Sequence, residues 1–328
     1  MNNYDFILAD TLAKFKATVK KHDKIRVAYS GGADSDCMMK LATLAGLSIT
    51  AVFYDTGIEY EATERHIEYM RGQGYTIDTT RAAMPIPTSN RKYGTPLVNK
   101  RASDYIGRLQ SHDFDFQNHG AYDFNTLYKM YPNCKTALMW WCNGYEGKSQ
   151  WNIKNNPHLK EFIIANGINF AVANKCCDGA KKYPMRDYAK TNDLDLVVLG
   201  IRKAEGGGRV GAYKSCYTKV KADSYHVYMP LFWWDENMRA WFIKSQNIQL
   251  SDAYTVYGLK RTGCAGCPFG RDFLGEMRTV ERFEPKLAKG IHAIFKDAHE
   301  FTTAYKQFQA AQRVPENQPR LPFGGGHE

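Results

Sequence analysis

The sequence predicts an α/β protein built on a parallel, Rossmann-like sheet, with a helical insertion and a helical C-terminal region. Three observations carry this prediction. Short apolar runs alternate with amphipathic stretches over the first 80 residues, as in a parallel sheet covered by helices. One of these runs ends in a glycine-rich turn that opens a helix. The rhythm then breaks over residues 85–165 and resumes after them.

The elements follow in order along the chain. Apolar side chains recur at helical spacing in residues 4–21, and Ile25–Tyr29 has the composition of a short buried strand. The pattern then predicts helices over 34–46 and 61–73 and strands over 48–54 and 75–80. Two later runs, 168–172 and 194–199, fit the same sheet, with residues 178–191 as the crossover helix. A further strand is expected over 225–232, and helices over 235–246 and much of 271–311.

This pattern divides the chain into three parts. Residues 1–84 and 166–270 are expected to form a nucleotide-binding domain. Residues 85–165, rich in Asn, Gly, Pro and aromatic side chains, are expected to form an insertion or cap. Residues 271–328 are expected to be helical, and their Pro- and Gly-rich end, 315–328, to be a loose tail.

Composition narrows the partners and the compartment. The 328 residues carry a formal net charge of +10, which favours an anionic partner, either a nucleotide or a nucleic acid. The N-terminus lacks the apolar core of a secretory signal, and no apolar run reaches the roughly 20 residues that span a bilayer. We therefore expect a cytoplasmic protein with no membrane partner. In such a reducing compartment, we expect the eight cysteines to be metal ligands or catalytic thiols rather than disulfides.

The sharpest local signal is the turn Ser30-Gly31-Gly32-Ala33-Asp34-Ser35. It follows the first strand and opens a helix, and ligands of open α/β sheets bind at that edge. Two glycines let the backbone approach an anion, and the amides at the helix start hold phosphate. Ser30 and Ser35 add hydroxyl groups. The Lys of a Walker A loop is missing. The alternative is an ordinary Gly-Gly turn with Asp34 as the helix cap.

The turn resembles the S-G-G-x-D-S PP-loop of the ATP pyrophosphatases and of the phosphoadenylyl-sulfate and adenylyl-sulfate reductases. In the reductase-like branch, the second strand ends in a similar D-T-G-x-E stretch, and here residues 55–59 are Asp55, Thr56, Gly57, Ile58 and Glu59. The resemblance implies that these residues bind an adenine nucleotide. Acidic groups at a strand end can hold its ribose, or magnesium if the nucleotide is ATP. The alternative is a turn capped by Asp55.

Four cysteines form a second constellation, with Cys176 and Cys177 adjacent and Cys264 and Cys267 in a CxxC. Four thiolates can hold zinc or an iron–sulfur cluster. Adjacent cysteines reach a single tetrahedral ion less comfortably than the separate irons of a cubane, so the spacing favours a [4Fe–4S] cluster over zinc. Free buried thiols are the third alternative.

The flanking residues extend the resemblance. The stretch from Cys176 to Met185 is similar to the C-C-x-x-x-K-x-x-P-[LM] element of cluster-bearing adenylyl-sulfate reductases. In that family, the Lys at the position of Lys181 lies near the cluster and helps to hold the sulfate of the substrate. The CxxC sits in a segment similar to the family's G-x-x-R-x-G-C-x-x-C-[PT].

A third stretch, from Gly200 to Arg209, resembles the family's G-[LIV]-R-x-x-E-S-x-x-R, with Gly206 in place of the usual Ser. Arg202 and Arg209 are therefore expected to grip phosphate or sulfate, because guanidinium groups suit such anions. The alternative is a surface ion pair between Arg202 and Glu205. Residues 230–235 also resemble a short sequence element of the same family. We interpret their side chains as part of the protein core rather than of the chemistry.

The resemblance breaks at the C-terminal end. Sulfonucleotide reductases attack sulfur with a Cys in an E-C-G-[LI]-H element, and this chain has no Cys after Cys267. Either another thiol such as Cys216 takes the role of nucleophile or the chemistry differs. Cys37, Cys134 and Cys142 are expected to be packing residues.

Basic and aromatic residues of the insertion would suit a nucleic acid, because cations bind phosphate and aromatic rings stack on bases. The alternative is a solvated cap with an aromatic core. The expected partners are thus an adenine nucleotide, together with a nucleic acid or a sulfur-donor protein, and a homodimer is compatible with the sequence. The basic residues are Arg91, Lys92, Lys100, Arg101, Arg108, Lys129, Lys135 and Lys148.

Three functions fit these features. The first is ATP-dependent adenylylation and sulfur transfer assisted by a cluster, as in phosphorothioation-type relatives, and the missing terminal Cys favours it. The second is sulfonucleotide reduction, which the Lys181 element favours. The third is a non-catalytic nucleotide-binding module with a structural metal site. Under the first two, the catalytic residues are expected among Lys181, Arg202, Arg209 and Cys216.

Overall fold

The computed structural model describes residues 3–82, 84–147, 151–206, 213–220, 225–270 and 272–312. Its centre is one six-stranded sheet in the order β3-β2-β1-β4-β6-β5. Every pair of neighbouring strands is parallel except β5 and β6. The strands are β1 (Ile25–Tyr29), β2 (Ala51–Asp55), β3 (Ile77–Arg81), β4 (Leu196–Leu199), β5 (Tyr217–Lys219) and β6 (His226–Tyr228).

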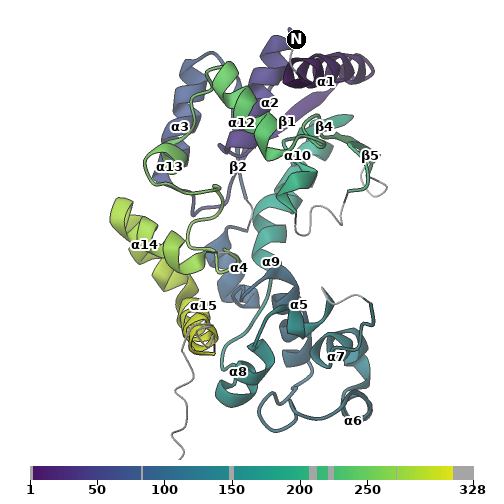
Figure 1. Cartoon of the computed structure of the whole chain (residues 1–328), viewed down its shortest axis with the longest axis vertical. Helices are drawn as coiled ribbons and strands as arrows, with labels where there is room; N and C mark the ends of the chain where they lie inside the picture. The colour runs from purple at the N-terminus through teal and green to yellow at the C-terminus, as the bar shows by residue number, and fades with distance from the viewer. Residues whose placement is uncertain are drawn as a thin grey trace, which may run out of the picture.

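The sheet has this order because the most apolar strands lie at its centre. All four residues of β4 are buried, and Val27 of β1 lies between Ala51 on one side and Val198 on the other. Helices packed against the strands complete the Rossmann-like layers, which confirms the predicted fold class (Figure 1). These helices are α1 (Asn3–Val19), α2 (Ala33–Leu44), α3 (Glu61–Gly72), α10 (Tyr183–Thr191), α12 (Glu236–Ser245) and the short α13 (Asp252–Thr255).

The insertion is helical and has an apolar core of its own. Trp140 and Trp141 are fully buried there, and the indole N–H of Trp141 donates to the carbonyl of Gly120 at 2.9 Å. Figure 1 shows the helices of residues 100–166 at the opposite end of the molecule from β1 and α2, and the helix of residues 86–93 between the two ends. The helices of the insertion are α4 (Ile86–Tyr93), α5 (Lys100–Gln110), α6 (Phe124–Met130), α7 (Lys135–Trp141) and α8 (Leu159–Asn166), with the 3₁₀ turns η1 (Pro132–Cys134) and η3 (Ile153–Asn155).

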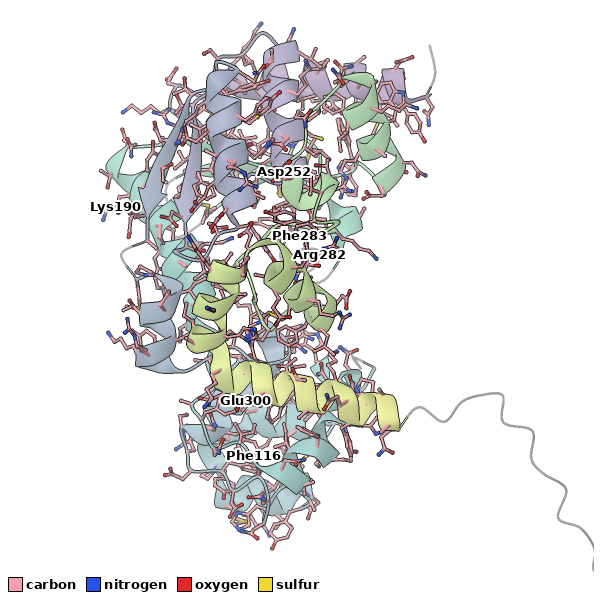
Figure 2. All side chains as sticks on the ribbon, turned by 90° about the vertical axis from the view of Figure 1, so that its left-hand side faces the viewer. Phe116, Lys190, Asp252, Arg282, Phe283 and Glu300 are labelled. Atoms are coloured by element: carbon pink, nitrogen blue, oxygen red, sulfur yellow. The ribbon has the colours of Figure 1, made fainter. Side chains whose placement is uncertain are left out.

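The C-terminal helices α14 (Phe273–Phe283) and α15 (Pro285–Ala311) join the two ends. Figure 2 shows α15, which carries Glu300, beside the insertion, which carries Phe116. Phe301 and Tyr305 of α15 belong to the insertion core, while Ile291 and Phe295 belong to a separate cluster with Cys176. Phe295 has non-helical backbone angles, so α15 is kinked between these two contacts.

One sequence-based strand prediction was wrong. Residues 168–172 do not join the sheet, and Val172 makes only an isolated bridge to Thr95. The run is apolar because Ile168, Phe170 and Val172 pack into the insertion core, so burial there mimics a strand pattern. The predicted crossover helix is three segments: α9 (Lys175–Cys177), the π-helix η4 (Asp178–Lys182) and α10. The 3₁₀ turn η5 (Lys203–Glu205) follows β4.

The antiparallel edge strand β5 was not predicted, because its three residues are too few for a pattern. The expected tail, 315–328, lies outside the described residues. Within the described ranges, no helix combines the length and the apolar character needed to cross a membrane.

Candidate active site

The predicted phosphate loop connects β1 to α2 and is held by its own hydrogen bonds. The Ser35 hydroxyl accepts from the Gly32 amide at 3.0 Å and donates to the Gly32 carbonyl at 2.7 Å. Ser30 Oγ lies 3.3 Å from Ser35 Oγ. These bonds fix the turn at the carboxyl edge of the sheet, where parallel α/β proteins bind ligands.

Both glycines of the loop are required by close neighbours. Gly31 has φ +64°, and a Cβ there would lie 2.7 Å from Thr63 Cγ2. A Cβ on Gly32 would lie 2.9 Å from Thr262 Oγ1 and 3.1 Å from the hydroxyl oxygen of Tyr254. The segment that leads into the CxxC is therefore packed directly on the phosphate loop.

Tyr254 ties these two segments together. Its hydroxyl oxygen accepts from the Ala33 amide at 3.3 Å and from the Thr262 amide at 3.2 Å. Tyr254 and Thr262 were not predicted as site residues, since neither stands out in the sequence. Only the fold brings residues 254–262 beside residues 31–33.

Asp34, in the first turn of α2, is paired with two arginines. Its Oδ1 lies 2.8 Å from Nε of Arg202 and 3.5 Å from Nη1 of Arg239. Both arginines also pair with Glu236 on α12. Arg202 is only 3% exposed, so the alternative of a surface ion pair with Glu205 does not hold, and the guanidinium lies buried beside Asp34.

This network leaves donors unused. Nη1 of Arg202 and Nε of Arg239 are buried and have no hydrogen-bond partner within the described part of the chain. Buried donors of this kind are expensive unless a ligand or water satisfies them. An anion beside the phosphate loop would do so. Arg239 was not predicted, because an Arg in an amphipathic helix carries no sequence signal.

The two acidic residues predicted at the end of β2, Asp55 and Glu59, lie in different surroundings. Asp55 Oδ1 accepts from the Gly57 amide at 2.8 Å, and its Oδ2 lies 3.9 Å from Nε of Arg81. Glu59 is buried and accepts from the Thr56 hydroxyl at 2.7 Å. Burial raises the pKa of Glu59, and the nearby Lys181 opposes that shift. Glu59 thus faces the thiol side of the site, while Asp55 stays at the strand end.

The fold brings all four predicted cysteines into electrostatic contact with one another. A hydrogen bond with Cys176, assisted by Lys100 and Lys181 and opposed by burial, lowers the pKa of Cys177 to about 6. The same hydrogen bond, with burial and the other three thiols, raises the pKa of Cys176. Burial raises the pKa of Cys264, and it raises the pKa of Cys267 to about 12.

Lys181 is the cation of this thiol group. Cys264 is the largest influence that raises its pKa, and Glu59, Cys177 and Cys267 act in the same direction. Lys181 therefore remains charged among groups that carry or can carry negative charge. The insertion contributes a second cation, since Lys100 Nζ lies 3.4 Å from Asp178 Oδ1 beside Cys177.

The four thiols do not form a ready-made site for a single ion in the described part of the chain. A single zinc ion needs its sulfur ligands about 2.3 Å from one point. Among the described residues, no three His, Cys, Asp or Glu side chains are grouped so that they could hold one ion. Cysteine thiolates are ligands for both zinc and iron–sulfur clusters, so the donor set is compatible with either.

The remaining predicted residues lie apart from the thiols or outside the described residues. Cys216 packs with Tyr225 and Met229 in an apolar cluster of β4 and β6, not in the cluster that contains Cys176 and Cys264. Cys37 and Cys134 are core residues and Cys142 packs beside the insertion core, as expected. Arg209 and Lys148 lie outside the described residues.

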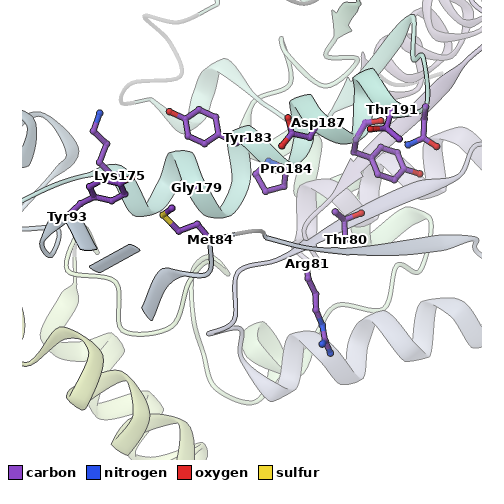
Figure 3. A pocket seen from close by; sticks show the side chains of 12 residues that line it. Thr80, Arg81, Met84, Tyr93, Lys175, Gly179, Tyr183, Pro184, Asp187 and Thr191 are labelled. Carbon is purple, nitrogen blue, oxygen red and sulfur yellow. The ribbon is translucent and has the colours of Figure 1, made fainter. Parts of the chain in front are cut away.

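A groove of about 650 Å³ lies along α9, η4 and α10 (Figure 3). Lys175, Gly179 and Tyr183 recur every fourth residue, so they share one helical face, which excludes Cys177 and Lys181. None of the site residues predicted from the sequence lines this groove.

Comparison with known proteins supports the domain type. Residues 145–269 match the family model of the phosphoadenosine phosphosulfate reductase domain. An uncharacterized protein of Methanocaldococcus jannaschii is 23% identical over 293 residues, which are 88% of this chain and 44% of that protein. The chain thus spans less than half the length of this relative.

Among solved structures, phosphoadenylyl-sulfate reductase from Candida auris, in a phosphate complex, is similar with a TM-score of 0.45 and 9% identity, covering 80% of this chain and 96% of that one. The ammonia-dependent NAD synthetase of Campylobacter jejuni has a TM-score of 0.37 and 11% identity, over 97% and 100% of the two chains. The NMN synthetase of Francisella tularensis has a TM-score of 0.36 and 10% identity, over 98% and 100%.

The family match confirms the resemblance to the phosphoadenylyl-sulfate reductase family of PP-loop proteins. It covers the four cysteines, Lys181 and Arg202, and it begins after the phosphate loop. The four thiols therefore lie in a region similar to the reductase domain, and the phosphate loop lies outside the matched residues.

Proposed function

We propose that the protein is an adenine-nucleotide-binding PP-loop enzyme that carries out ATP-dependent adenylylation and sulfur transfer, assisted by a [4Fe–4S] cluster. The observation that carries the proposal is the direct packing of the CxxC segment on the phosphate loop, through Tyr254 and Thr262. A nucleotide in the loop and a group at the thiols would be neighbours.

At the nucleotide end, the loop amides and the free donors of Arg202 and Arg239 would bind the phosphates. Asp55, partly exposed at the end of β2, would bind the ribose or a magnesium ion on ATP. An acceptor oxygen would attack the α-phosphorus of ATP, forming an acceptor–AMP bond and releasing pyrophosphate. A sulfur donor would then displace AMP from the acceptor.

At the thiol end, Cys176, Cys177, Cys264 and Cys267 would hold the cluster, which supplies electron transfer or a sulfur-binding iron. Lys181 would place an anionic group beside the thiols, and the buried Glu59 would balance its charge. Lys100 would carry positive charge from the insertion to the same place. A nucleic acid or a sulfur-donor protein would be the macromolecular partner of such a reaction.

Sulfonucleotide reduction is the second candidate. The match to the reductase domain and the Lys181 element favour it. Against it, Cys216 lies in a different apolar cluster from the four thiols. Its thiol would need a substantial rearrangement to attack a sulfur bound near Lys181.

Anaerobic protein assayed for iron, sulfide and zinc, and then incubated with magnesium and ATP, separates these functions. Adenylylation predicts release of pyrophosphate and AMP, dependent on Arg202. Sulfite release from an adenylyl sulfate, with no turnover of ATP, would instead support reduction. Nucleotide binding with neither activity would support a non-catalytic module and overturn the proposal.

A further inference from the structure

A chain of hydrogen-bonded side chains reaches the CxxC loop from the C-terminal helices. His299 of α15 is 5% exposed, and its Nε2 lies 2.8 Å from the carbonyl oxygen of Gly266, between the two cysteines of the CxxC. Its Nδ1 lies 3.3 Å from Nδ1 of His292, whose Nε2 lies 3.0 Å from Glu281 Oε1. The chain ends at the surface, since His292 and Glu281 are about half exposed.

The partners fix where the hydrogens lie. A carbonyl oxygen can only accept, so Nε2 of His299 carries a hydrogen. Burial lowers the pKa of His299 and favours its neutral form, so Nδ1 accepts. Nδ1 of His292 lies beside it, and Nε2 of His292 lies beside the Glu281 carboxylate. The Gly266 carbonyl therefore sets the tautomer of His299, and the contact with His292 helps to hold the ring toward Gly266.

The backbone of Gly266 is tightly constrained by its neighbours on α15. Its φ is +64°, and a Cβ there would lie 2.5 Å from Cδ1 of Ile291 on the same helix α15. Phe273 and Phe295 pack against the His299 ring at centroid distances of 5.1 and 5.5 Å. The ring therefore has little freedom to leave the carbonyl that it binds.

We propose that His299 is a positioning residue for the CxxC loop, and that His292 and Glu281 help to hold its ring toward Gly266. By fixing the Gly266 carbonyl, His299 sets the directions in which the thiols of Cys264 and Cys267 point. This inference concerns the loop that the proposed function assigns to the cluster, but it makes a prediction for the thiols themselves, with or without iron.

Two amide variants test the donor position. In Gln, the Nε2 amide occupies nearly the place of the His Nε2, whereas the shorter Asn cannot reach it. The metal-free wild type, His299→Gln and His299→Asn would be alkylated with iodoacetamide, and the rate at each cysteine followed by peptide mass spectrometry. His299→Asn is expected to raise the rates at Cys264 and Cys267 roughly tenfold, and His299→Gln to restore them to within about twofold of the wild type.

Two references separate positioning from general destabilisation. Cys216 lies in another apolar cluster, so its rate should not change. Tyr305→Phe removes a hydrogen bond of 2.8 Å between the same helix and Pro157, so it should lower the thermal midpoint without changing the CxxC rates. Equal CxxC rates in the Gln and Asn variants, or a rise in Tyr305→Phe as large as in His299→Asn, would overturn the proposal. Iron-free wild-type protein would count against the cluster and leave this test valid.

Discussion

Glycine at position 31 shows how a single residue shapes the site. Its left-handed backbone and its contact with Thr63 are separate constraints, and a second glycine carries only the first of them. Gly46 has φ +68°, and nothing lies within 4 Å of the place where its Cβ would be. The pair therefore separates backbone strain from steric overlap.

We expect Gly46→Ala to lower the free energy of unfolding by about 1–2 kcal/mol, the cost of a left-handed conformation. Gly31→Ala should cost a further 1–3 kcal/mol, roughly the cost of overpacking, because its Cβ would overlap Thr63. Urea denaturation of both variants measures the difference. Equal losses would mean that the phosphate loop moves away from Thr63 at little cost.

His299 makes a prediction about acid stability. Its pKa is lowered by burial in the folded state, so the unfolded chain binds more protons as the pH falls below about 6.5. The contribution of His299 to the free energy of unfolding should therefore be constant above pH 6.5. Below pH 6.5 it should decrease, by at most about 1.4 kcal/mol per pH unit. His299→Gln should show a shallower fall between pH 6.5 and 5. Parallel curves for the two proteins would contradict a neutral buried His299.

At the scale of elements, the carboxyl edge of the sheet is held together by charge pairs between segments far apart in sequence. Arg202 follows β4, Asp34 opens α2, and Arg239 lies on α12. Removing one partner of a buried ion pair should lower the free energy of unfolding more than removing one partner of a surface pair of the same length. Lys14 and Asp10 on α1 provide that comparison, at 2.7 Å and largely exposed.

Arg202→Met is expected to lower the free energy of unfolding by about 3 kcal/mol, because it strips Asp34 of its closest partner in a buried site. Lys14→Met should change it by less than about 1 kcal/mol. The Arg202 variant should also lose affinity for pyrophosphate, measured by calorimetry. A small stability effect at Arg202 would indicate that Arg239 alone neutralises Asp34.

The sequence predicted most elements because their patterns are local. β1 and the start of α3 were placed at their observed residues, since each apolar run is bounded by polar or glycine residues. The run at 168–172 failed because apolar periodicity reports burial, and here the burial is in the insertion core. The π-helix around Lys181 was invisible for a related reason, because its pattern differs little from that of an α-helix.

The candidate site was predictable only where a motif marks it. The four cysteines, Lys181 and Arg202 were found from short motifs, and the fold places them at one edge of the sheet. Arg239, Tyr254, Thr262 and His299 were not found, because each acts through a neighbour that is distant in sequence. Charge and hydrogen-bonding capacity are visible in a sequence, but the partner that uses them is not.

At the scale of the whole molecule, α15 joins parts that the sequence analysis separated. Its first half packs on the CxxC loop through Ile291 and His299, and its second half packs on the insertion through Phe301 and Tyr305. Phe301 contacts Phe162 and Phe170 at centroid distances of 5.1 and 6.1 Å. The insertion and the thiol site therefore share a structural element.

Phe301→Ala should destabilise the protein by about 3–5 kcal/mol, the usual cost of removing a buried aromatic ring. Because α15 couples the two ends, unfolding should remain one transition. It would be followed by far-ultraviolet circular dichroism and by the fluorescence of a variant with Trp233→Phe, Trp234→Phe and Trp241→Phe, whose remaining tryptophans all lie in the insertion. Separate transitions for the two probes would show that the insertion unfolds independently of the sheet.

The central claim is that the four thiols at the edge of the sheet hold an iron–sulfur cluster. Its most direct test is the visible spectrum of the anaerobically purified protein, with Cys264→Ser and Cys216→Ser beside the wild type. We expect a brown absorbance at about 400 nm, which is typical of such clusters. This absorbance should be lost in Cys264→Ser and kept in Cys216→Ser. A colourless wild type, or a spectrum unchanged by Cys264→Ser, would contradict it.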